Sequence, residues 1–556
     1  MTSVLPDGRY DLGTYRRQVT TASPDAQAWF DRGLVWAYSF NHEEALRCFR
    51  QAVEHDAQCA MAHWGIAYAI GPNYNKAWSR FDRTDLETSA GVGRAALEKA
   101  LALSEQATPV ERALIEGLTA RFPTGPIPED LGTLDHAYAE KMRTAYQRHS
   151  DDLDVAALFV EALMCISPRA LWDLDSGEPT GFGTVEARST IEQVMRRPDA
   201  AEHPALPHLY IHLMEMSPYP EVALPAADRL RRLVPDGSHM AHMATHIDAA
   251  CGDWRRVVDS NTDAAAADDK FFAREPEPSF YSVYRGHNLY AKAYGAMMSG
   301  RYQDALAAAR RLDEILTADL LRTPRPPLAD WAECMRTAMP HVLIRFGRWQ
   351  EILDLELPED QELLCSTTAM IHYARGVAYA ALGRVPEAEE ARALFAVARA
   401  KVPATRIASI PALEVDVLGV AAEMLDGELE YRKGSFGKAF AHLRRAIELE
   451  DALPYADPPA WLQPVRHAYG ALLVEQGQIE EAAAIYQADL GLDDALPRRR
   501  THPNNVWSLH GLHECLTQLG RDAQARQIAV QRDIAIASAD VPIGASCFCR
   551  QTACSA

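Results

Sequence analysis

Residues 26–52 read AQAWFDRGLVWAYSFNHEEALRCFRQA, and this stretch decides the fold. A bulky residue, Trp29, stands four positions before a small one, Gly33, and a second small residue, Ala45, follows twelve positions after Gly33. Small residues let two helix backbones approach closely, and aromatic side chains fill the gap to the next pair of helices. The pattern therefore predicts two antiparallel helices. The first carries Trp29, Gly33 and Trp36, and the second carries Ala45, Phe49 and Ala52.

The same spacing recurs along the chain, and a generic amphipathic bundle would not repeat it so often. It joins Ala293 to Ala305, Gly376 to Ala388, Gly427 to Ala439, Gly470 to Ala482 and Gly511 to Ala523. This is the pattern of the tetratricopeptide repeat (TPR). We therefore expect an all-α, TPR-like α-solenoid, a superhelix of stacked antiparallel helical hairpins. Alternating strand patterns are weak throughout.

The expected organisation has four parts. They are an N-terminal extension (1–25), an N-terminal TPR-like lobe (26–322), a C-terminal TPR-like lobe (328–540) and a Cys-rich tail (541–556). The loop TPRPP at 323–327 predicts the division between the two lobes. Within 80–200 the repeats lose register and proline-bearing turns separate longer helices, which indicates divergent hairpins or an inserted helical cap.

Charge and hydropathy narrow the partners and the compartment. The 556 residues carry a net charge of −21, with 77 acidic and 56 basic side chains. Phosphate backbones and anionic membrane surfaces would repel such a chain, so we expect no nucleic acid and no membrane as partner. The N-terminus has no basic region followed by an apolar one, and no window has about 18 uninterrupted apolar residues. We therefore expect a cytoplasmic protein.

Histidines gather in one window. Nineteen in 556 residues predict about 1.5 in any 44 residues, yet the window 203–246 holds six: His203, His208, His212, His239, His242 and His246. In PHLYIHLMEMSP, His208, His212 and Glu215 fall at i, i+4 and i+7 of an expected helix. In SHMAHMATHID, His239, His242 and His246 fall at i, i+3 and i+7 of another.

A third expected helix, about 220–233, separates these two, so in a solenoid of hairpins they lie side by side and their imidazoles converge. The next such helix, about 284–298, carries His287 near its start. Imidazole with carboxylate suits iron, copper, zinc or manganese. A histidine-lined site for an organic molecule or a peptide, and a purely structural cluster, are the alternatives. The sequence HExxH is absent.

Further candidates lie outside this window, each weaker alone. They are His42 and His63 near the N-terminus and His467, His510 and His513 near the C-terminus. The tail CFCRQTAC adds Cys547, Cys549 and Cys554. A C-x-C-x4-C run of thiols suits Cu(I) or zinc binding, a redox pair, or a tail folded back into the groove.

These stretches resemble a group of bacterial and fungal TPR-domain proteins. The matching segments lie between about 40 and 516 and include FNHEEALRCFRQAVEHDAQCAMAHWGIAYAIGPNYN, HLYIHLMEMSPYPEVALPAADRL, SHMAHMATHID, YRGHNLYAKAYGAMMSGRY and HPNNVWSLHGLHECL. The resemblance implies a TPR superhelix. It also implies that His42, His208, His212, Glu215, His239, His242, His246 and His287 form one shared feature, HxxxHxxE followed by HxxHxxxH.

Three functions compete. In the first, a transition metal ion (Fe, Cu or Zn) sits inside the superhelix and catalyses oxidoreductase-like chemistry on a small metabolite or peptide, with Glu215 as ligand or general base. In the second, the chain is an interaction scaffold that binds a peptide in its concave groove. In the third, it stores or delivers metal, with the thiol tail as a mobile carrier.

Overall fold

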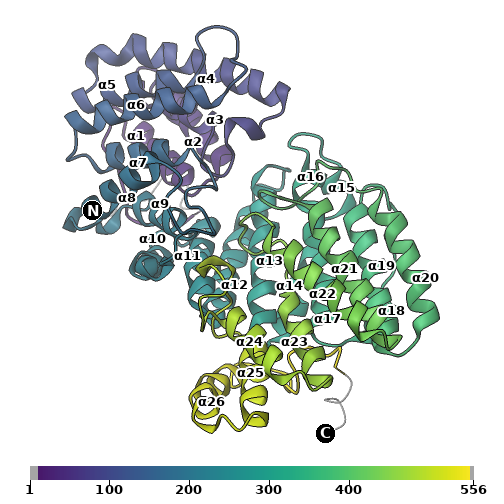
Figure 1. The fold of residues 1–556 in the computed structure, drawn as a ribbon. Helices are drawn as coiled ribbons and strands as arrows, with labels where there is room; N and C mark the ends of the chain where they lie inside the picture. Colours follow the sequence, from purple (N-terminus) through teal and green to yellow (C-terminus); the bar gives the residue numbers. More distant parts are fainter. Residues whose placement is uncertain (1–9, 551–556) are drawn as a thin grey trace. The chain divides into compact units, whose positions relative to one another are not determined.

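The computed structural model describes residues 10–550, and α-helices make up nearly all regular structure there (Figure 1). The described chain divides into two compact units: unit 1 holds 10–247 and 266–275, and unit 2 holds 248–265 and 276–550. Both consist of antiparallel helical hairpins stacked in sequence, which confirms the predicted all-α, TPR-like solenoid. The loop 323–327 falls within unit 2, and the four predicted parts stay a prediction.

The first stretch of chain contains the helices α1 to α12, and the last two of these continue from one unit into the other. Their bounds are α1 Pro24–Tyr38, α2 His42–His55, α3 Ala60–Ile70, α4 Arg83–Leu103, α5 Pro109–Leu118, α6 Gly132–Arg148, α7 Leu153–Met164, α8 Phe182–Met195, α9 Ala205–Met214, α10 Leu224–Leu233, α11 Ser238–Cys251 and α12 Trp254–Phe272. Short 3-10 helices lie between them at Trp78–Arg80, Ser104–Gln106, Thr119–Arg121, Pro198–Glu202 and Pro220–Ala223. The divergent region 80–200 is thus helical, and its consecutive helices pack on one another.

Unit 2 continues with longer hairpins. Its helices are α13 Tyr281–Met298, α14 Tyr302–Ile315, α15 Ala318–Leu321, α16 Leu328–Ala332, α17 Ala338–Arg345, α18 Trp349–Leu353, α19 Cys365–Ala381, α20 Val385–Arg399, α21 Glu414–Arg432, α22 Phe436–Asp451, α23 Val465–Glu475, α24 Ile479–Leu490, α25 Val506–Gln518 and α26 Asp522–Ile536. The 3-10 helices Glu333–Thr337 and Arg498–Arg500 and the two-stranded hairpin β1 Ile407–Ser409 with β2 Ala412–Leu413 complete it.

One aromatic ring joins neighbouring hairpins in each unit. In unit 1 the ring of Phe49 on α2 lies against Gly33 on α1 and Gly65 on α3: a Cβ added to either glycine would meet the ring within 2.8 Å. Two helices therefore close on the ring only because neither carries a side chain there. The contact of Gly33 with Phe49 thus joins the two helices of the first hairpin.

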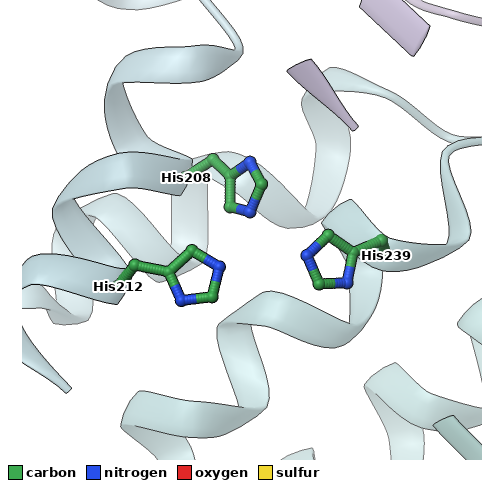
Figure 2. Close-up of side chains that lie close together, drawn as sticks. All are labelled: His208, His212 and His239. Carbon is green, nitrogen blue, oxygen red and sulfur yellow. The ribbon is translucent and has the colours of Figure 1, made fainter. Parts of the chain in front are cut away.

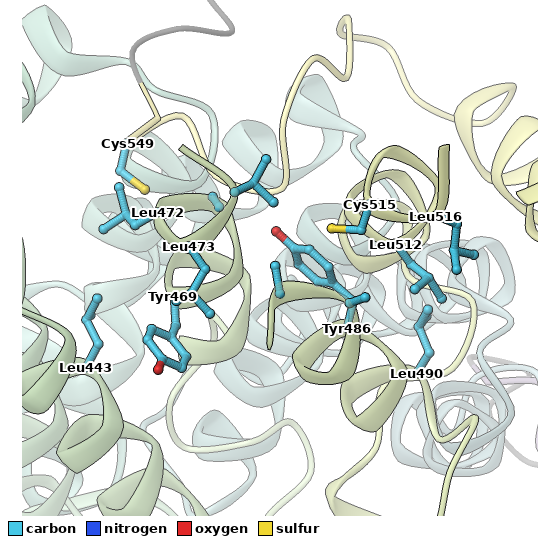
Figure 3. Packing of buried hydrophobic residues seen from close by; sticks show 14 of the residues in the cluster. Leu443, Tyr469, Leu472, Leu473, Tyr486, Leu490, Leu512, Cys515, Leu516 and Cys549 are labelled. Atoms are coloured by element: carbon cyan, nitrogen blue, oxygen red, sulfur yellow. The ribbon is translucent and has the colours of Figure 1, made fainter. Parts of the chain in front are cut away.

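The ring of Tyr486 has the same place in unit 2. It lies between Gly470 on α23 and Gly511 on α25, and a Cβ on either would come within 2.5 Å of it. Around it the apolar faces of these helices form a buried core (Figure 3). Cys549, from the tail after α26, belongs to the same core. The tail is therefore packed into unit 2.

The segment before α1 is held by charge and hydrogen bonds although it has no regular structure. Arg17 pairs with Asp152 and Asp154 at 2.9 and 2.6 Å, and Tyr15 donates to Asp154 over 2.6 Å. Burial raises the pKa of the Asp154 carboxyl, but Arg17, His203 and Tyr15 together outweigh burial, so the net shift is downward. The α1 helix then begins after Ser23, whose hydroxyl accepts from the backbone of Ala26.

Candidate metal centre in unit 1

Two buried helices supply the clustered histidines. Pro207 lies in the first turn of α9, where a proline costs no hydrogen bond, and every residue of α9 is buried. The α11 helix begins at Ser238 and is followed by Gly252 at a φ of +75°, the left-handed conformation that ends a helix. Both histidine faces are therefore fixed by regular helix.

Three imidazoles converge between these helices. His208 and His212 from α9 and His239 from α11 turn their rings toward one another (Figure 2). One ring nitrogen from each lies within 4.8 Å of the others, and all three side chains are buried. Three imidazoles with no thiolate form a donor set that suits a divalent transition metal.

The second nitrogen of two of these rings is already occupied. Nδ1 of His208 donates to the carbonyl oxygen of Tyr38 over 2.8 Å, and Nδ1 of His212 donates to Oε1 of Glu215 over 3.0 Å. Both acceptors lack a proton to give, so Nδ1 must carry the hydrogen and Nε2 the lone pair. Nε2 of each ring is buried without a hydrogen-bond partner. A metal-binding histidine has this arrangement, with one nitrogen held by a carbonyl or carboxylate and the other bare.

Burial also keeps these imidazoles neutral. It holds the pKa of His208 and that of His239 well below the ordinary value, and it lowers the pKa of His212 to about 4, although Glu215 opposes it there. Only a neutral imidazole binds a metal, so at neutral pH no proton has to leave these rings first.

Glu215 follows α9 directly and ties the two helices together. Its Oε1 accepts from His212, and its Oε2 accepts from Nδ1 of His246 on α11. Burial would raise the pKa of this carboxyl, but His246 and His212 outweigh burial and hold it well below its usual range. Nε2 of His246 in turn lies 2.9 Å from Nε2 of His242.

His212, Glu215 and His246 form a second group whose ligand atoms lie within 4.8 Å. For a metal to bind between Glu215 and Nδ1 of His212, the proton on that nitrogen would have to leave. The group of His208, His212 and His239 needs no such change. The arrangement therefore favours Glu215 as the carboxylate that orients His212.

Phe40 is a site residue that the sequence analysis missed. Its ring stacks on His212, with planes at 12° and centroids 5.8 Å apart, and its centroid lies 4.5 Å from that of His208 and 5.3 Å from that of His239. Its backbone φ is +56°, a left-handed conformation that costs a bulky residue about 1–2 kcal/mol. Strain kept at one residue is typical of functional sites.

The corresponding turn of other hairpins contains glycine. It is Gly300 after α13, Gly347 after α17, Gly383 after α19, Gly434 after α21, Gly477 after α23 and Gly520 after α25, all with positive φ. Phe40 stands at this position after α1. Aligning the hairpins by their turns would have singled it out, because Phe replaces Gly only beside the histidines.

Tyr74 and a small pocket complete the surroundings. The Tyr74 ring lies 4.8 Å from that of His212. The pocket reaches His208 and is otherwise lined by Tyr38, Phe40, Tyr68, Ala157, Leu158, Glu161, Ala205 and Leu209. Two tyrosines and one carboxylate thus interrupt the apolar wall of this pocket beside His208.

The other predicted residues of the N-terminal half are not among the three converging imidazoles. His42 begins α2 and stacks on Phe40 from 5.9 Å, and burial lowers its pKa to about 3. His63 bonds the carbonyl of Ala57, and His203 lies 3.3 Å from Asp154. His287, on α13, is half-buried and belongs to unit 2, so its place in the cluster stays a prediction.

The C-terminal candidates belong to unit 2, and of these His467, Cys547 and Cys549 border one pocket. His467 donates from Nε2 to Asp489 over 3.0 Å, and His513 accepts from Arg532 over 2.5 Å. His510 lies on α25, and burial lowers its pKa. Cys547 and Cys549 form a disulfide, and Cys554 lies outside the described residues.

Comparison with known proteins supports the repeat. Residues 26–59 match the tetratricopeptide repeat model, which covers the first hairpin, α1 with α2. The chain is thus similar to TPR-domain proteins. No curated protein matches it by sequence.

Several solved structures are similar in fold. The human IFIT1 dimer with m7Gppp-AAAA is 13% identical with a TM-score of 0.30, covering 86% of this chain and 90% of that one. Yeast Tom70 is 11% identical with a TM-score of 0.27, covering 92% and 90%. The P58(IPK) TPR domain is 13% identical with a TM-score of 0.17, covering 76% and 99%. At this identity the likeness concerns the fold alone.

Within residues 10–550, none of the helices combines the length and the apolar content that crossing a bilayer requires. The cytoplasmic location and the exclusion of nucleic acid stay predictions.

Proposed function

We propose that this TPR-domain protein binds one divalent transition metal ion in unit 1, through Nε2 of His208, Nε2 of His212 and a ring nitrogen of His239. The observation that carries the proposal is the pair of bare, buried Nε2 atoms, each on a ring whose Nδ1 is fixed by a carbonyl or a carboxylate. A buried polar atom without a partner costs about 1–3 kcal/mol, and a metal ion would remove this cost.

Three protein ligands leave a coordination position open, as catalytic zinc sites do. A small pocket borders His208, and the open position is the feature that a reaction at the metal requires. This supports chemistry at the metal over storage, since a storage site needs no vacant position. Oxidoreductase chemistry is part of the proposal, and the loading experiment below identifies the metal as iron, copper or zinc.

The test is metal content. The full chain, purified without a tag or chelator, is loaded separately with Fe(II), Cu(II), Zn(II) and Co(II), desalted and analysed by mass spectrometry. We expect one ion per chain, lost when His208→Asn or His212→Asn is introduced. Co(II) bound by three imidazoles and a water gives visible absorption bands of a four-coordinate ion, which report the geometry independently of activity.

His63→Asn is the matched control. His63 lies in the same unit, is half-buried and bonds a backbone carbonyl. The His63→Asn variant should therefore retain the metal ion. If a folded wild-type chain retains no ion after loading, or if the His63 variant loses the ion as fully as the His212 variant, the proposal is wrong. The interaction scaffold would then be the better account.

A further inference from the structure

The chain after α26 turns back onto unit 2 and is anchored at its start. Oδ1 of Asp540 accepts from the backbone nitrogen of Tyr302 over 2.6 Å, and Oδ2 accepts from that of Gln303 over 2.9 Å. These nitrogens open α14, so Asp540 caps that helix from a distant part of the sequence. Pro542 is exposed and lies between Asp540 and the buried residues that begin at Ala545.

Residues 545–550 are then held through their main chain. The Arg345 guanidinium donates to the carbonyl of Ser546, and that of Arg432 donates to the carbonyl of Cys549. These arginines end α17 and α21. Contacts of this kind depend on the backbone and not on the side chains of the segment they hold.

Side chains of the tail add three further contacts. The Ser546 hydroxyl lies 2.5 Å from the Tyr486 hydroxyl, and the Phe548 ring packs on Gly347 and faces Trp507 at 6.0 Å. Arg550 forms two hydrogen bonds with Glu514, of 2.7 and 2.8 Å. A hydroxyl, an aromatic ring and a cation are thus bound at alternate positions of this segment, 546, 548 and 550.

The tail leaves space beside it. A pocket borders the disulfide between Cys547 and Cys549 and is lined on its other sides by residues of α17, α19, α21 and α23, including Arg345 and His467, and by Trp461 from the loop before α23. Nε of Arg345 is buried without a hydrogen-bond partner. The small Cys side chains therefore do not fill the groove that holds them.

We propose that unit 2 contains a peptide-binding groove whose present occupant is the chain's own tail, residues 543–550, and that a partner protein displaces it. The partner presents a segment with a hydroxyl residue, an aromatic residue two positions later and a basic residue two positions after that. An apolar side chain larger than Cys next to the aromatic residue would fill the space that the tail leaves. The groove lies in unit 2 and does not depend on the metal centre.

The experiment releases the tail from folded protein. A protease site is inserted beside Pro542 in the full chain, and the purified chain is cleaved under reducing conditions. We expect helical circular dichroism to persist, the 543–556 fragment to leave on gel filtration, and a fluorescent 543–556 peptide to bind the stripped chain. Intact chain should bind that peptide at least about 100-fold more weakly, because the tethered tail competes at millimolar effective concentration.

Two paired variants test the chemistry of the partner. The Arg550→Glu peptide should bind the stripped wild-type chain at least tenfold more weakly than the natural peptide does. Its affinity should recover when the stripped chain carries Glu514→Arg. The Cys547→Met peptide should bind more tightly than the natural one. If the fragment cannot be exchanged, or if cleavage unfolds unit 2, the tail is an integral part of the core and the proposal is overturned. Binding that ignores the Glu514 and Arg550 exchange overturns the stated partner chemistry.

Discussion

Nδ1 of His212 and Oε1 of Glu215 lie 3.0 Å apart, and neither side chain meets solvent. Glu215→Gln keeps the shape of the side chain but offers one carbonyl where the carboxylate accepts from two imidazoles. One ring then loses its acceptor and its fixed orientation. We expect metal affinity to fall by about 10–100-fold, the usual effect of losing such a partner. Competitive titration with a chromophoric chelator measures this.

The control for that variant is Glu116→Gln, on the exposed side of α5. It removes a carboxylate from the same unit and should leave the affinity unchanged. Equal affinity in the Glu215 variant and the wild type would show that the carboxylate has no part in binding.

Phe40→Ala and Phe40→Gly should separate strain from packing. Both variants lose the same buried ring, and both should be less stable than the wild type by about 3–5 kcal/mol. They differ only at the φ of +56°, which glycine adopts freely and alanine does not. We expect the glycine variant to be more stable than the alanine variant by about 1 kcal/mol in urea unfolding. The reverse order would mean that the turn relaxes when the ring is gone.

Gly65→Ala should destabilise unit 1. The added Cβ would lie 2.4 Å from the Phe49 ring, which Gly33 confines from the other side, so the ring has nowhere to move. Overpacking of this kind costs about 1–3 kcal/mol. Gly91→Ala, on α4 with no atom within 4 Å of the new Cβ, is the control and should stabilise by about 0.5–1 kcal/mol. Thermal unfolding followed by circular dichroism compares the two variants. If the melting temperature shifts in the same direction in both, the close packing of Phe49 against Gly65 is not the cause.

His341 in unit 2 predicts a pH dependence. Burial lowers its pKa from 6.5 to about 3, so between these values the unfolded chain binds a proton that the folded chain does not. Stability therefore falls as pH drops below 6.5, and at pH 5 this one group has removed about 2 kcal/mol. The urea midpoint of the wild type should fall between pH 7 and 5. The urea midpoint of the His341→Leu variant should fall less over the same pH range. An equal decline of the midpoint in both proteins would show that His341 does not titrate as stated.

Much of the fold could be predicted because its signals are local. Gly33 and Ala45 mark a hairpin by spacing alone, and the i+4 and i+3 spacings of the histidines fixed their helix faces. Contacts that join distant segments carry no such signal. The carbonyl of Tyr38 behind His208 and the carboxyl of Asp540 on α14 depend on how the chain packs, so neither could be read from spacing.

The candidate site was predicted in part. His208, His212, His239 and Glu215 were named, and the structure groups them, but the spacing could not separate ligand from orienting residue. That distinction depends on which ring nitrogen faces an acceptor. Phe40 could have been found, since the turns after α13, α17 and α19 contain glycine at its position. His63 shows that the presence of a histidine does not by itself predict a ligand, because its ring bonds the carbonyl of Ala57 in the turn before α3.

The shared ring of Phe49 also bears on how unit 1 opens. Helices α1 and α3 belong to successive hairpins, yet both pack on the ring of Phe49. If either helix separates from α2, that ring is exposed to solvent and loses half of its packing. Local opening should therefore propagate across at least two hairpins at once. In hydrogen exchange, the amides of α1, α2 and α3 would then share one protection free energy, and the first repeat would behave as half of a larger cooperative segment.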